Sequence, residues 1–280
     1  MSVARVLILG ASGRLGGMLR RHWSAQGATP VWQFRRAPLT SVATGSVHLC
    51  DPLAGLPQCG PVDVVVGLAG VVPAKGDVSL NSDLGLAAVD CAVGLRARHV
   101  FLSSSAAVYG PSTTLLGEQG GAFPVSAYGR AKLEMEQAAL ARAARHGIAV
   151  TALRIGNVAG ADALLGQSGE SRRLDQFSDG RGPVRSYIGP VEFARLVQAL
   201  VQLACGGLRL PARLNLALEG GVAMADLCDA AGVPFQWHPA PETALQSVVL
   251  DVAQLARLVP LPKAEAAEIV ADWRADRRCA

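Results

Sequence analysis

The 280-residue sequence predicts an α/β fold, a Rossmann-type doubly wound parallel sheet followed by a small C-terminal α/β region. Short apolar runs alternate with amphipathic helical stretches through the first half of the chain, which is typical of βαβ units. A glycine-rich turn follows the first apolar run at once, where a tight turn between strand and helix favours residues without a Cβ. After Gly156 this alternation gives way to a polar, glycine-rich stretch and then to separate helical stretches.

The composition excludes several classes of protein. Apolar residues make up 50% of the chain and charged residues 17%, which does not suit a disordered protein. Lys plus Arg number 26 against 22 Asp plus Glu, a net charge of +4 without a basic block, so we expect no nucleic-acid partner. The sequence has no signal peptide and no apolar run of about 18 residues, so we expect a cytoplasmic protein without a membrane segment. The six cysteines form no CxxC pair, which indicates free thiols and no metal site.

The elements of the first half follow from apolar patterning and capping residues. Residues 3–9 form an apolar run that suits a strand buried on both faces. The longest helix is predicted at 126–146, with Ser126 near its N-cap and Gly147 as its stop. The other expected strands are 31–34, 47–50, 63–68, 99–103 and 148–153, and the other expected helices are 14–26 and 81–96.

The second half is expected to be a smaller region packed over one edge of the sheet. Residues 161–183 show no periodicity and predict a long loop, which in a compact domain is usually a lid or a binding loop. We therefore divide the chain into a core, 1–160, and a region 161–280 of which 184–204 returns to the core. The helices expected in this region are 190–204, 224–231 and 264–274, and the strands are 213–217 and 248–250.

The glycine-rich turn GASGRLG predicts a dinucleotide site. A Cβ at its glycines would obstruct the turn and the approach of a pyrophosphate, and the start of the following helix offers free N–H groups. The alternative is a plain tight turn between strand and helix. The expected cofactor-binding residues of the turn are Gly10, Ser12, Gly13, Arg14, Leu15 and Gly16.

The end of the second strand favours NADP over NAD. An NAD site usually has an acidic residue there for the ribose 2′-hydroxyl, whereas this strand is followed by Arg35 and Arg36. Two guanidiniums can hold a 2′-phosphate, with Arg14 as a third contact, although a solvated surface pair is the alternative. Three further residues are cofactor-binding candidates. Asp51 can accept a hydrogen bond from the adenine amino group, or it can simply begin a turn. Ala69 and Gly70 are small enough to lie against the ribose of the cofactor, or they can simply permit tight packing.

The strongest catalytic signal combines a serine run with Tyr128-x-x-x-Lys132. The tyrosine and lysine are four residues apart on a predicted helix, so they share one face. A neighbouring ammonium and an oxidised nicotinamide would lower the tyrosine pKa and make it a usable acid/base. Ser103 and Ser105 end the preceding strand, where a hydroxyl can hold a substrate oxygen.

These motifs together resemble a known family. GASGRLG, LSSSAAVYG (102–110), YGRAK (128–132) and LRIGNVAG (153–160) are similar to the extended short-chain dehydrogenase/reductase superfamily. Within it they resemble the NAD(P)-dependent epimerase/dehydratase group around UDP-glucose 4-epimerase. Asn81 stands where that group opens a helix, and the run DGRGPVRSYI (179–188) resembles its segment with an anion-binding arginine. The resemblance covers residues 1 to about 200 in order.

The resemblance implies roles for individual residues. Tyr128 is the implied catalytic acid/base and Lys132 its partner. Ser105 would hold the substrate hydroxyl, with Ser103 near the nicotinamide. Asn157 is implied to contact substrate and Arg185 to bind an anion. Two departures weaken the inference, since the acid after the second strand is absent and Gly189-Pro190-Val191-Glu192 replaces the group's His-x-Asp-Asp-like string.

Three functions therefore stay open from the sequence. The first is an NAD(P)-dependent oxidoreductase that transfers hydride at a secondary alcohol or ketone of a sugar or sugar nucleotide. The second is an NAD-dependent sugar-nucleotide epimerase that removes and returns the hydride. The third is a non-catalytic NADP-sensing regulatory protein. In each case residues 1–160 would hold the coenzyme and residues 161–280 mainly the substrate. Members of the superfamily often form dimers through a pair of helices, so the resemblance also implies that this protein can form a homodimer.

Overall fold

A seven-stranded parallel sheet forms the centre of the molecule in the computed structural model, which describes residues 3–38, 41–167 and 171–279. The strand order is β11-β6-β5-β4-β1-β2-β3, so the chain runs outward from β1 in one direction and then returns to build the other half. All six neighbouring pairs are parallel. The strands are β1 (Arg5–Leu9), β2 (Thr29–Phe34), β3 (Ser46–Leu49), β4 (Val64–Gly67), β5 (His99–Ser105), β6 (Ala149–Ile155) and β11 (Arg213–Leu216).

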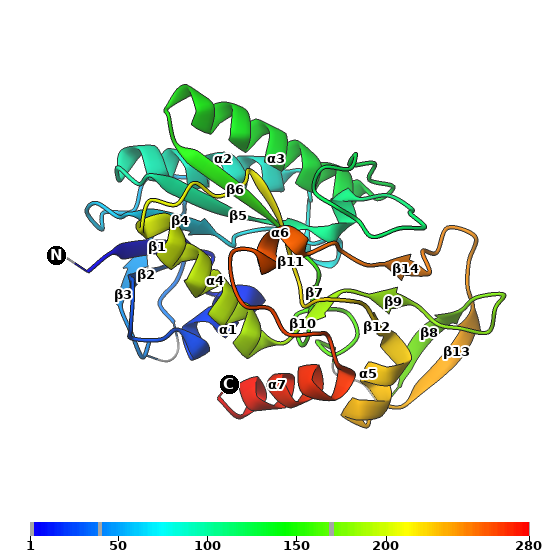
Figure 1. Cartoon of the computed structure of the whole chain (residues 1–280). Helices are drawn as coiled ribbons and strands as arrows, with labels where there is room; N and C mark the ends of the chain where they lie inside the picture. The colour runs from blue at the N-terminus through cyan, green and yellow to red at the C-terminus, as the bar shows by residue number, and fades with distance from the viewer. Residues whose placement is uncertain (1–2, 39–40, 168–170, 280) are drawn as a thin grey trace.

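Helices cover both faces of this sheet (Figure 1). On one face α2 (Leu80–Gly94) packs against α3 (Ala127–Arg145), and on the other α1 (Arg14–His22) packs against α4 (Pro190–Cys205). Short 3₁₀ turns, η1 (Pro73–Lys75) and η2 (Ala106–Val108), follow β4 and β5. The result is a three-layer α/β arrangement of the Rossmann type, as the sequence predicts.

The C-terminal region lies beside the ends of β5 and β6, at the right of Figure 1. It contains three small sheets, β10-β7, β12-β9-β14 and β13-β8. Two helices, α5 and α7, pack against each other, and α7 also packs on α4. The elements are β7 (Asn157–Val158), β8 (Arg172–Gln176), β9 (Val184–Arg185), β10 (Tyr187–Ile188), β12 (Val222–Ala223), α5 (Met224–Ala231), β13 (Phe235–Pro239), β14 (Ser247–Val248), α6 (Ala253–Ala256) and α7 (Ala266–Arg278).

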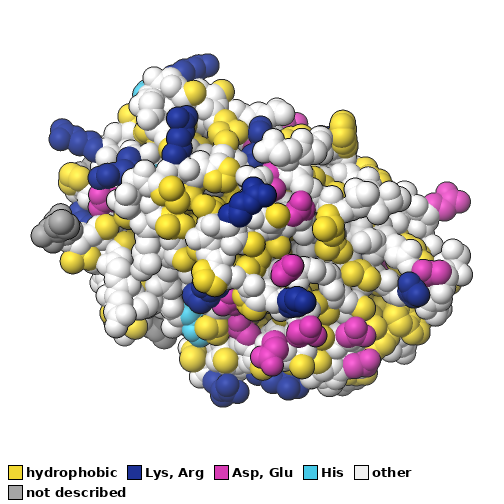
Figure 2. All heavy atoms as spheres, viewed as in Figure 1, with side chains coloured by type: hydrophobic (Ala, Val, Ile, Leu, Met, Phe, Trp, Pro, Cys, Tyr) yellow, Lys and Arg dark blue, Asp and Glu magenta, His cyan; other side chains and the backbone are white. Residues whose placement is uncertain are grey.

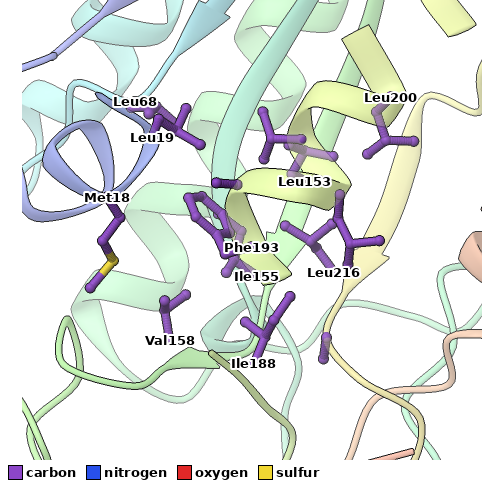
Figure 3. Close-up of a cluster of buried hydrophobic side chains, with 14 of the residues drawn as sticks. Met18, Leu19, Leu68, Leu153, Ile155, Val158, Ile188, Phe193, Leu200 and Leu216 are labelled. Carbon is purple, nitrogen blue, oxygen red and sulfur yellow. The ribbon is translucent and has the colours of Figure 1, made fainter. Parts of the chain in front are cut away.

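Two hydrophobic cores lie on the two faces of the sheet. Successive residues of β1 alternate between them, with Val6 and Ile8 in one core and Leu7 and Leu9 in the other. Such a strand is apolar on both faces, which explains its continuous apolar run. Figure 3 shows the larger core, in which Phe193 of α4 lies close to Ile155 at the end of β6.

The capping residues of the longest helix behave as the sequence predicts. The Ser126 hydroxyl accepts a hydrogen bond from the Gly129 N–H at 3.0 Å. Gly147 has a φ of 65°, the left-handed conformation that ends a helix most readily at glycine. The first helix is shorter than expected, because α1 ends at His22 rather than at residue 26.

The predicted strand at 213–217 is present as β11, which pairs with β6 as the seventh strand of the main sheet. One expectation for the second half is wrong: the stretch 161–183 is not one loop, since β8 pairs in parallel with β13 over five residues. Sequence periodicity could not reveal this pairing, because the two partners lie about 60 residues apart. Part of that stretch, 168–170, lies outside the described residues.

The described part of the chain contains no helix that is both long and apolar enough to cross a membrane. All six cysteines are free thiols in the structure.

Candidate functional site

The glycine-rich turn joins β1 to α1 at the carboxyl edge of the sheet. Gly10 has a φ of 84°, and a Cβ on it would lie 2.6 Å from the Ala69 backbone nitrogen. A Cβ on Gly16 would collide with the Gly10 carbonyl oxygen. The first helical N–H groups of α1 have no carbonyl one turn earlier, so they face outward at the positive end of the helix. Both glycines are therefore required by the close backbone approach, and the turn leaves donors available for an anion.

Gln33 holds this turn in place, which the sequence reading missed. Its side chain is buried, accepts a hydrogen bond from the Gly10 N–H at 2.9 Å and donates one to the Cys50 carbonyl at 2.6 Å. The Ala11 N–H also donates to the Gln33 carbonyl at 3.1 Å. A glutamine inside the apolar run of β2 was the available signal, because a buried amide requires hydrogen-bond partners.

The arginines predicted for a 2′-phosphate lie at the surface. Arg35 and Arg36 are exposed directly after β2, and no hydrogen bond or ion pair holds either side chain within the described part of the chain. Arg14 is exposed and donates to the Ala161 carbonyl at 2.9 Å. Asp51 is exposed and accepts from the Leu53 N–H at 3.0 Å, which is the turn that the alternative interpretation describes.

The predicted catalytic residues do lie together. Ser105 is the last residue of β5, and its side chain lies near enough to Tyr128, in the first turn of α3, to affect the ionisation of the phenol. Lys132, one turn further, is buried, and its ammonium lies 5.9 Å from the centre of the Tyr128 ring. The ammonium donates to the Ser103 carbonyl at 2.7 Å. Strand and helix thus place three functional groups at one end of the sheet.

Burial dominates the acid–base behaviour of this group. It lowers the pKa of Lys132 to about 8, while the carboxylate of Glu136 acts in the opposite direction. Burial raises the pKa of Tyr128, and the nearby Ser105 side chain opposes that rise. The sequence predicts a lowered tyrosine pKa when both the ammonium and an oxidised nicotinamide lie nearby. In the protein alone the direction is opposite, because desolvation of the phenolate outweighs the other effects, and Tyr128 keeps its proton.

Gly70 forms an open cradle next to Lys132. It is exposed after β4, and a Cβ on it would lie 3.2 Å from the Lys132 ammonium and 3.1 Å from the Asn81 amide oxygen. Asn81 is buried and fixes this loop by hydrogen bonds with the N–H and carbonyl of Val71. The space that glycine leaves, the lysine donor beside it and the free N–H groups of α1 fit a nicotinamide dinucleotide.

A buried polar cluster behind the lysine was not predicted. Glu136 is fully buried, accepts from the Ser104 hydroxyl at 2.5 Å and forms a bidentate ion pair with Arg154 at 3.0 and 2.8 Å. The Arg154 guanidinium also lies 4.8 Å from the centre of the Tyr109 ring. Ser104, the middle serine of the run, therefore bonds to this buried cluster and not to the group formed by Ser105, Tyr128 and Lys132. A sequence signal existed, since Glu136 follows Lys132 by one helical turn on a face that is otherwise apolar.

The two predicted substrate residues have protein partners. Asn157 in β7 lies opposite Tyr187 of β10, whose hydroxyl donates to Asp162 at 2.8 Å. Arg185 in β9 donates to the carbonyls of Val184, Leu245 and Gln246 at 2.6 to 2.9 Å. Arg185 thus links β9 to the chain before β14. Its role as an anion ligand stays a prediction.

Comparison with solved structures supports the same fold. UDP-glucose 4-epimerase from Brucella ovis, solved with NAD, superimposes with a TM-score of 0.80 at 21% identity, over 96% of this chain and 97% of that one. MoeE5, solved with UDP-glucuronic acid and NAD, gives 0.76 at 22% identity over 98% and 99%. TunA, an NAD-dependent NDP-hexosamine 5,6-dehydratase of tunicamycin biosynthesis, gives 0.75 at 20% identity over 98% of each chain.

A search of curated proteins finds no match to this sequence. The profile of the NAD dependent epimerase/dehydratase family, by contrast, matches residues 6–179, well over half of the chain. The matched segment includes the glycine-rich turn, Ser105, Tyr128 and Lys132. The family consists of enzymes, so a purely regulatory role loses its support. This chain is an enzyme that belongs to the NAD dependent epimerase/dehydratase family.

Proposed function

We propose that this enzyme is an NAD(P)-dependent oxidoreductase that acts on a secondary alcohol or ketone of a sugar or sugar nucleotide. The observation that carries the proposal is the grouping of Ser105, Tyr128 and Lys132 at the edge of the sheet where the glycine-rich turn opens, with the Lys132 ammonium 5.9 Å from the centre of the Tyr128 ring. The sugar-nucleotide part of the proposal is supported by the solved structures with UDP-glucuronic acid or UDP-glucose.

The coenzyme would lie across the carboxyl edge of the sheet. The pyrophosphate would receive hydrogen bonds from the first N–H groups of α1, including those of Arg14 and Leu15. The nicotinamide half would lie near Gly70, where Lys132 is close enough to donate to a ribose hydroxyl. When bound, a nicotinamide exchanges hydride with the carbon that carries the reacting oxygen.

Tyr128 would transfer the proton that accompanies this exchange. The raised pKa keeps its hydroxyl protonated, which suits donation to the oxygen of a ketone substrate. The Ser105 side chain lies at the end of β5 near Tyr128, so its hydroxyl could hold the same substrate oxygen. Lys132 places a positive charge near the phenolate that remains, which stabilises it until a proton returns.

A specific observation favours the epimerase as the second candidate. The UDP-glucose 4-epimerase from Brucella ovis was solved with NAD, and NAD also accompanies MoeE5. An epimerase must keep its coenzyme through both half-reactions, whereas an oxidoreductase must exchange it. The nucleotide that remains with the purified protein therefore separates the two functions. Tightly retained NAD supports the epimerase, and a site that is empty after purification and binds NADPH supports the oxidoreductase.

Replacing Tyr128 with Phe tests the catalytic assignment. The ring should still pack, but the proton donor is lost, so turnover should fall by about 10² to 10⁴ while coenzyme affinity changes by no more than a few fold. A panel of UDP-sugars, followed by coenzyme absorbance, identifies the substrate first. Tyr187→Phe removes a buried hydroxyl outside the Ser105–Lys132 group and is the matched control. A Tyr128→Phe variant that keeps most of the wild-type turnover would exclude this role.

The double substitution Arg35→Ala/Arg36→Ala tests the preference for NADP. Only NADPH carries the 2′-phosphate, so its affinity should fall more than that of NADH. Because both side chains are exposed, the difference should be about tenfold or less. Fluorescence titration with each coenzyme measures the two affinities. Equal losses for both coenzymes would show that the two arginines are surface charges without a role in selection.

A further inference from the structure

The loop that joins the proposed catalytic serine to the proposed catalytic tyrosine begins and ends against the start of α3. A Cβ on Gly129 would lie 2.0 Å from the Ala107 carbonyl oxygen and 2.9 Å from Cβ of Pro124, so both ends of the connection meet beside Tyr128. Residues 109–126 are called the connecting loop below. Figure 1 shows this loop at the start of α3, next to the C-terminal region. A shift of the loop would therefore move the tyrosine relative to the serine.

Asn215 of β11 holds the middle of the connecting loop. Its side chain is fully buried, and the amide oxygen accepts a hydrogen bond from the Tyr109 hydroxyl at 2.8 Å. The amide nitrogen donates to the Leu116 carbonyl at 2.7 Å and to the Asp251 carbonyl at 2.8 Å. One side chain of the main sheet therefore joins two points of the loop to the C-terminal segment.

Glu118 reinforces this attachment from within the loop. Its carboxylate is buried and accepts hydrogen bonds from the Asn215 backbone N–H and from the Gln254 side-chain amide, both at 2.8 Å. The Leu116 N–H also donates to the Val249 carbonyl at 2.8 Å. Figure 2, drawn from the same side as Figure 1, shows few charged side chains on the surface around β14 and this loop, in agreement with the burial of the carboxylate.

The C-terminal segment that Asn215 binds also contacts the strand that carries Arg185. β14 pairs in parallel with β9, and just after β14 the Leu250 N–H donates to the hydroxyl of buried Ser186 at 2.9 Å. The hydrogen bonds of Asn215 therefore connect the loop beside the catalytic tyrosine with the region in which we expect the substrate to bind.

Tyr109 extends this connection toward the catalytic lysine. Its ring is buried, and the guanidinium that pairs with Glu136 lies 4.8 Å from the ring centre. Glu136 in turn acts on the pKa of Lys132. Because Asn215 fixes the Tyr109 hydroxyl, it also fixes the ring against which this ion pair packs.

We propose that Asn215 is a positioning residue of the active site, which fixes Tyr128 relative to the substrate-binding region through the connecting loop. The proposal rests on the proposed function, because it takes Tyr128 as the proton donor. Without the amide of Asn215, one hydroxyl and two carbonyls would be buried without partners, so the loop would have to move to satisfy them. A displacement of about 1 Å in a reacting group can slow a reaction about a hundredfold.

Two substitutions test the proposal at different strengths. Tyr109→Phe removes one hydrogen bond and keeps the ring, so kcat should fall about tenfold on the substrate that the UDP-sugar panel identifies. Asn215→Leu removes all three side-chain hydrogen bonds at similar volume, so kcat should fall about a hundredfold. Coenzyme affinity should change by no more than about threefold in both variants, because neither side chain lies at the glycine-rich turn.

Thr151→Val is the matched control. It also removes a buried side-chain hydrogen bond between β6 and β11, from the Thr151 hydroxyl to the Pro211 carbonyl, but toward the amino ends of these strands. Its kcat should equal that of the wild type even where its free energy of unfolding is lower. The comparison separates a loss of positioning from a general loss of stability.

Glu118 provides a rescue test of the same attachment. Glu118→Ala removes the acceptors for the Asn215 N–H and for Gln254, so it should lower kcat in the same direction as Asn215→Leu. In Glu118→Gln the new amide can accept from the Asn215 N–H and donate to Gln254 once the amide of Gln254 has turned over. Glu118→Gln should therefore recover most of the kcat that Glu118→Ala loses.

The ionisation of Tyr128 provides a readout that needs neither substrate nor coenzyme. The chain has three tyrosines, so the difference in tyrosinate absorbance between a protein and its Tyr128→Phe version reports on Tyr128 alone. Burial raises the pKa of Tyr128, so the pKa should fall in Asn215→Leu when the loop moves and water reaches the phenol. In Thr151→Val it should stay at the wild-type value.

The proposal is overturned if Asn215→Leu leaves the ionisation of Tyr128 unchanged, or if Thr151→Val lowers kcat as much as Asn215→Leu does. A failure of the proposed function has a different signature, because it appears as wild-type turnover in the Tyr128→Phe variant. The two failures are therefore distinguishable, since one is read from absorbance without substrate and the other from turnover.

Discussion

At the scale of the residue, the buried carboxylate of Glu136 links the catalytic lysine to the rest of the core. It lies one helical turn from Lys132 and raises the pKa that burial lowers. The same carboxylate holds Ser104 and Arg154, and Arg213 of β11 approaches it at 3.4 Å. A buried ion pair contributes little net stability when intact, but losing one partner leaves an uncompensated charge. Glu136 is therefore a positioning residue with two separable effects.

The substitution Glu136→Gln tests both effects. Arg154 loses its buried counter-ion, so the free energy of unfolding should fall by about 3 kcal/mol, measured by urea denaturation. Without the carboxylate the pKa of Lys132 should fall further below about 8, so its ammonium is lost at a lower pH. The alkaline limb of coenzyme affinity should then move to lower pH. Glu134→Gln, exposed on the same helix, is the control, and an unmoved alkaline limb in Glu136→Gln would contradict the positioning role.

The sequence predicts the residues that carry local signals and misses those whose partners are distant. Tyr128 and Lys132 are recognisable from their spacing on one helix. Gln33 and Glu136 depend on partners more than ten residues away in the chain, so no window of the sequence contains the interaction. The direction of the Tyr128 pKa shift could not be predicted from the sequence for the same reason, because it depends on burial by parts of the chain that are distant in sequence.

At the scale of the element, strands of four or more residues in the main sheet follow from their apolar runs. The two-residue strands β7, β10 and β12 are too short to show any period, and their existence depends on the partner strand. β13 carries Trp237 and His238 and lacks the continuous apolar run of a central strand. It pairs with β8 in parallel, which converts part of an expected loop into a small sheet.

The contact between β13 and the turn after β8 can be tested directly. A Cβ on Gly182 would lie 2.7 Å from the Trp237 ring, so the indole packs directly on this turn. In Trp237→Ala the amides of 177–183 should exchange hydrogen about tenfold faster, because the turn loses its packing partner. Hydrogen exchange with mass spectrometry measures this, with Leu208→Ala, exposed and remote in sequence, as the control. Unchanged exchange at 177–183 would show that the turn is held without the indole.

At the scale of the whole molecule, the main sheet depends on both halves of the chain. α4 covers one face of it with Phe193, Leu196 and Leu200, all fully buried, and β11 covers the open edge of β6. A fragment of residues 1–160 lacks these elements. It should aggregate or unfold without a cooperative transition, whereas the full chain should unfold cooperatively. Circular dichroism on heating measures both, and a cooperative transition in the fragment would show that the core folds without its C-terminal cover.

The position of β11 also has a consequence for biosynthesis. The Thr151 hydroxyl at β6 bonds the Pro211 carbonyl just before β11, two groups 60 residues apart in the chain. A ribosome extends the chain by roughly 5–20 residues per second, so β6 emerges roughly 3–12 seconds before its partner. During that interval the nascent chain presents an unpaired strand edge, a surface that other chains can join. Translation must pass Leu216, roughly three quarters of the chain, before the last strand can close that edge.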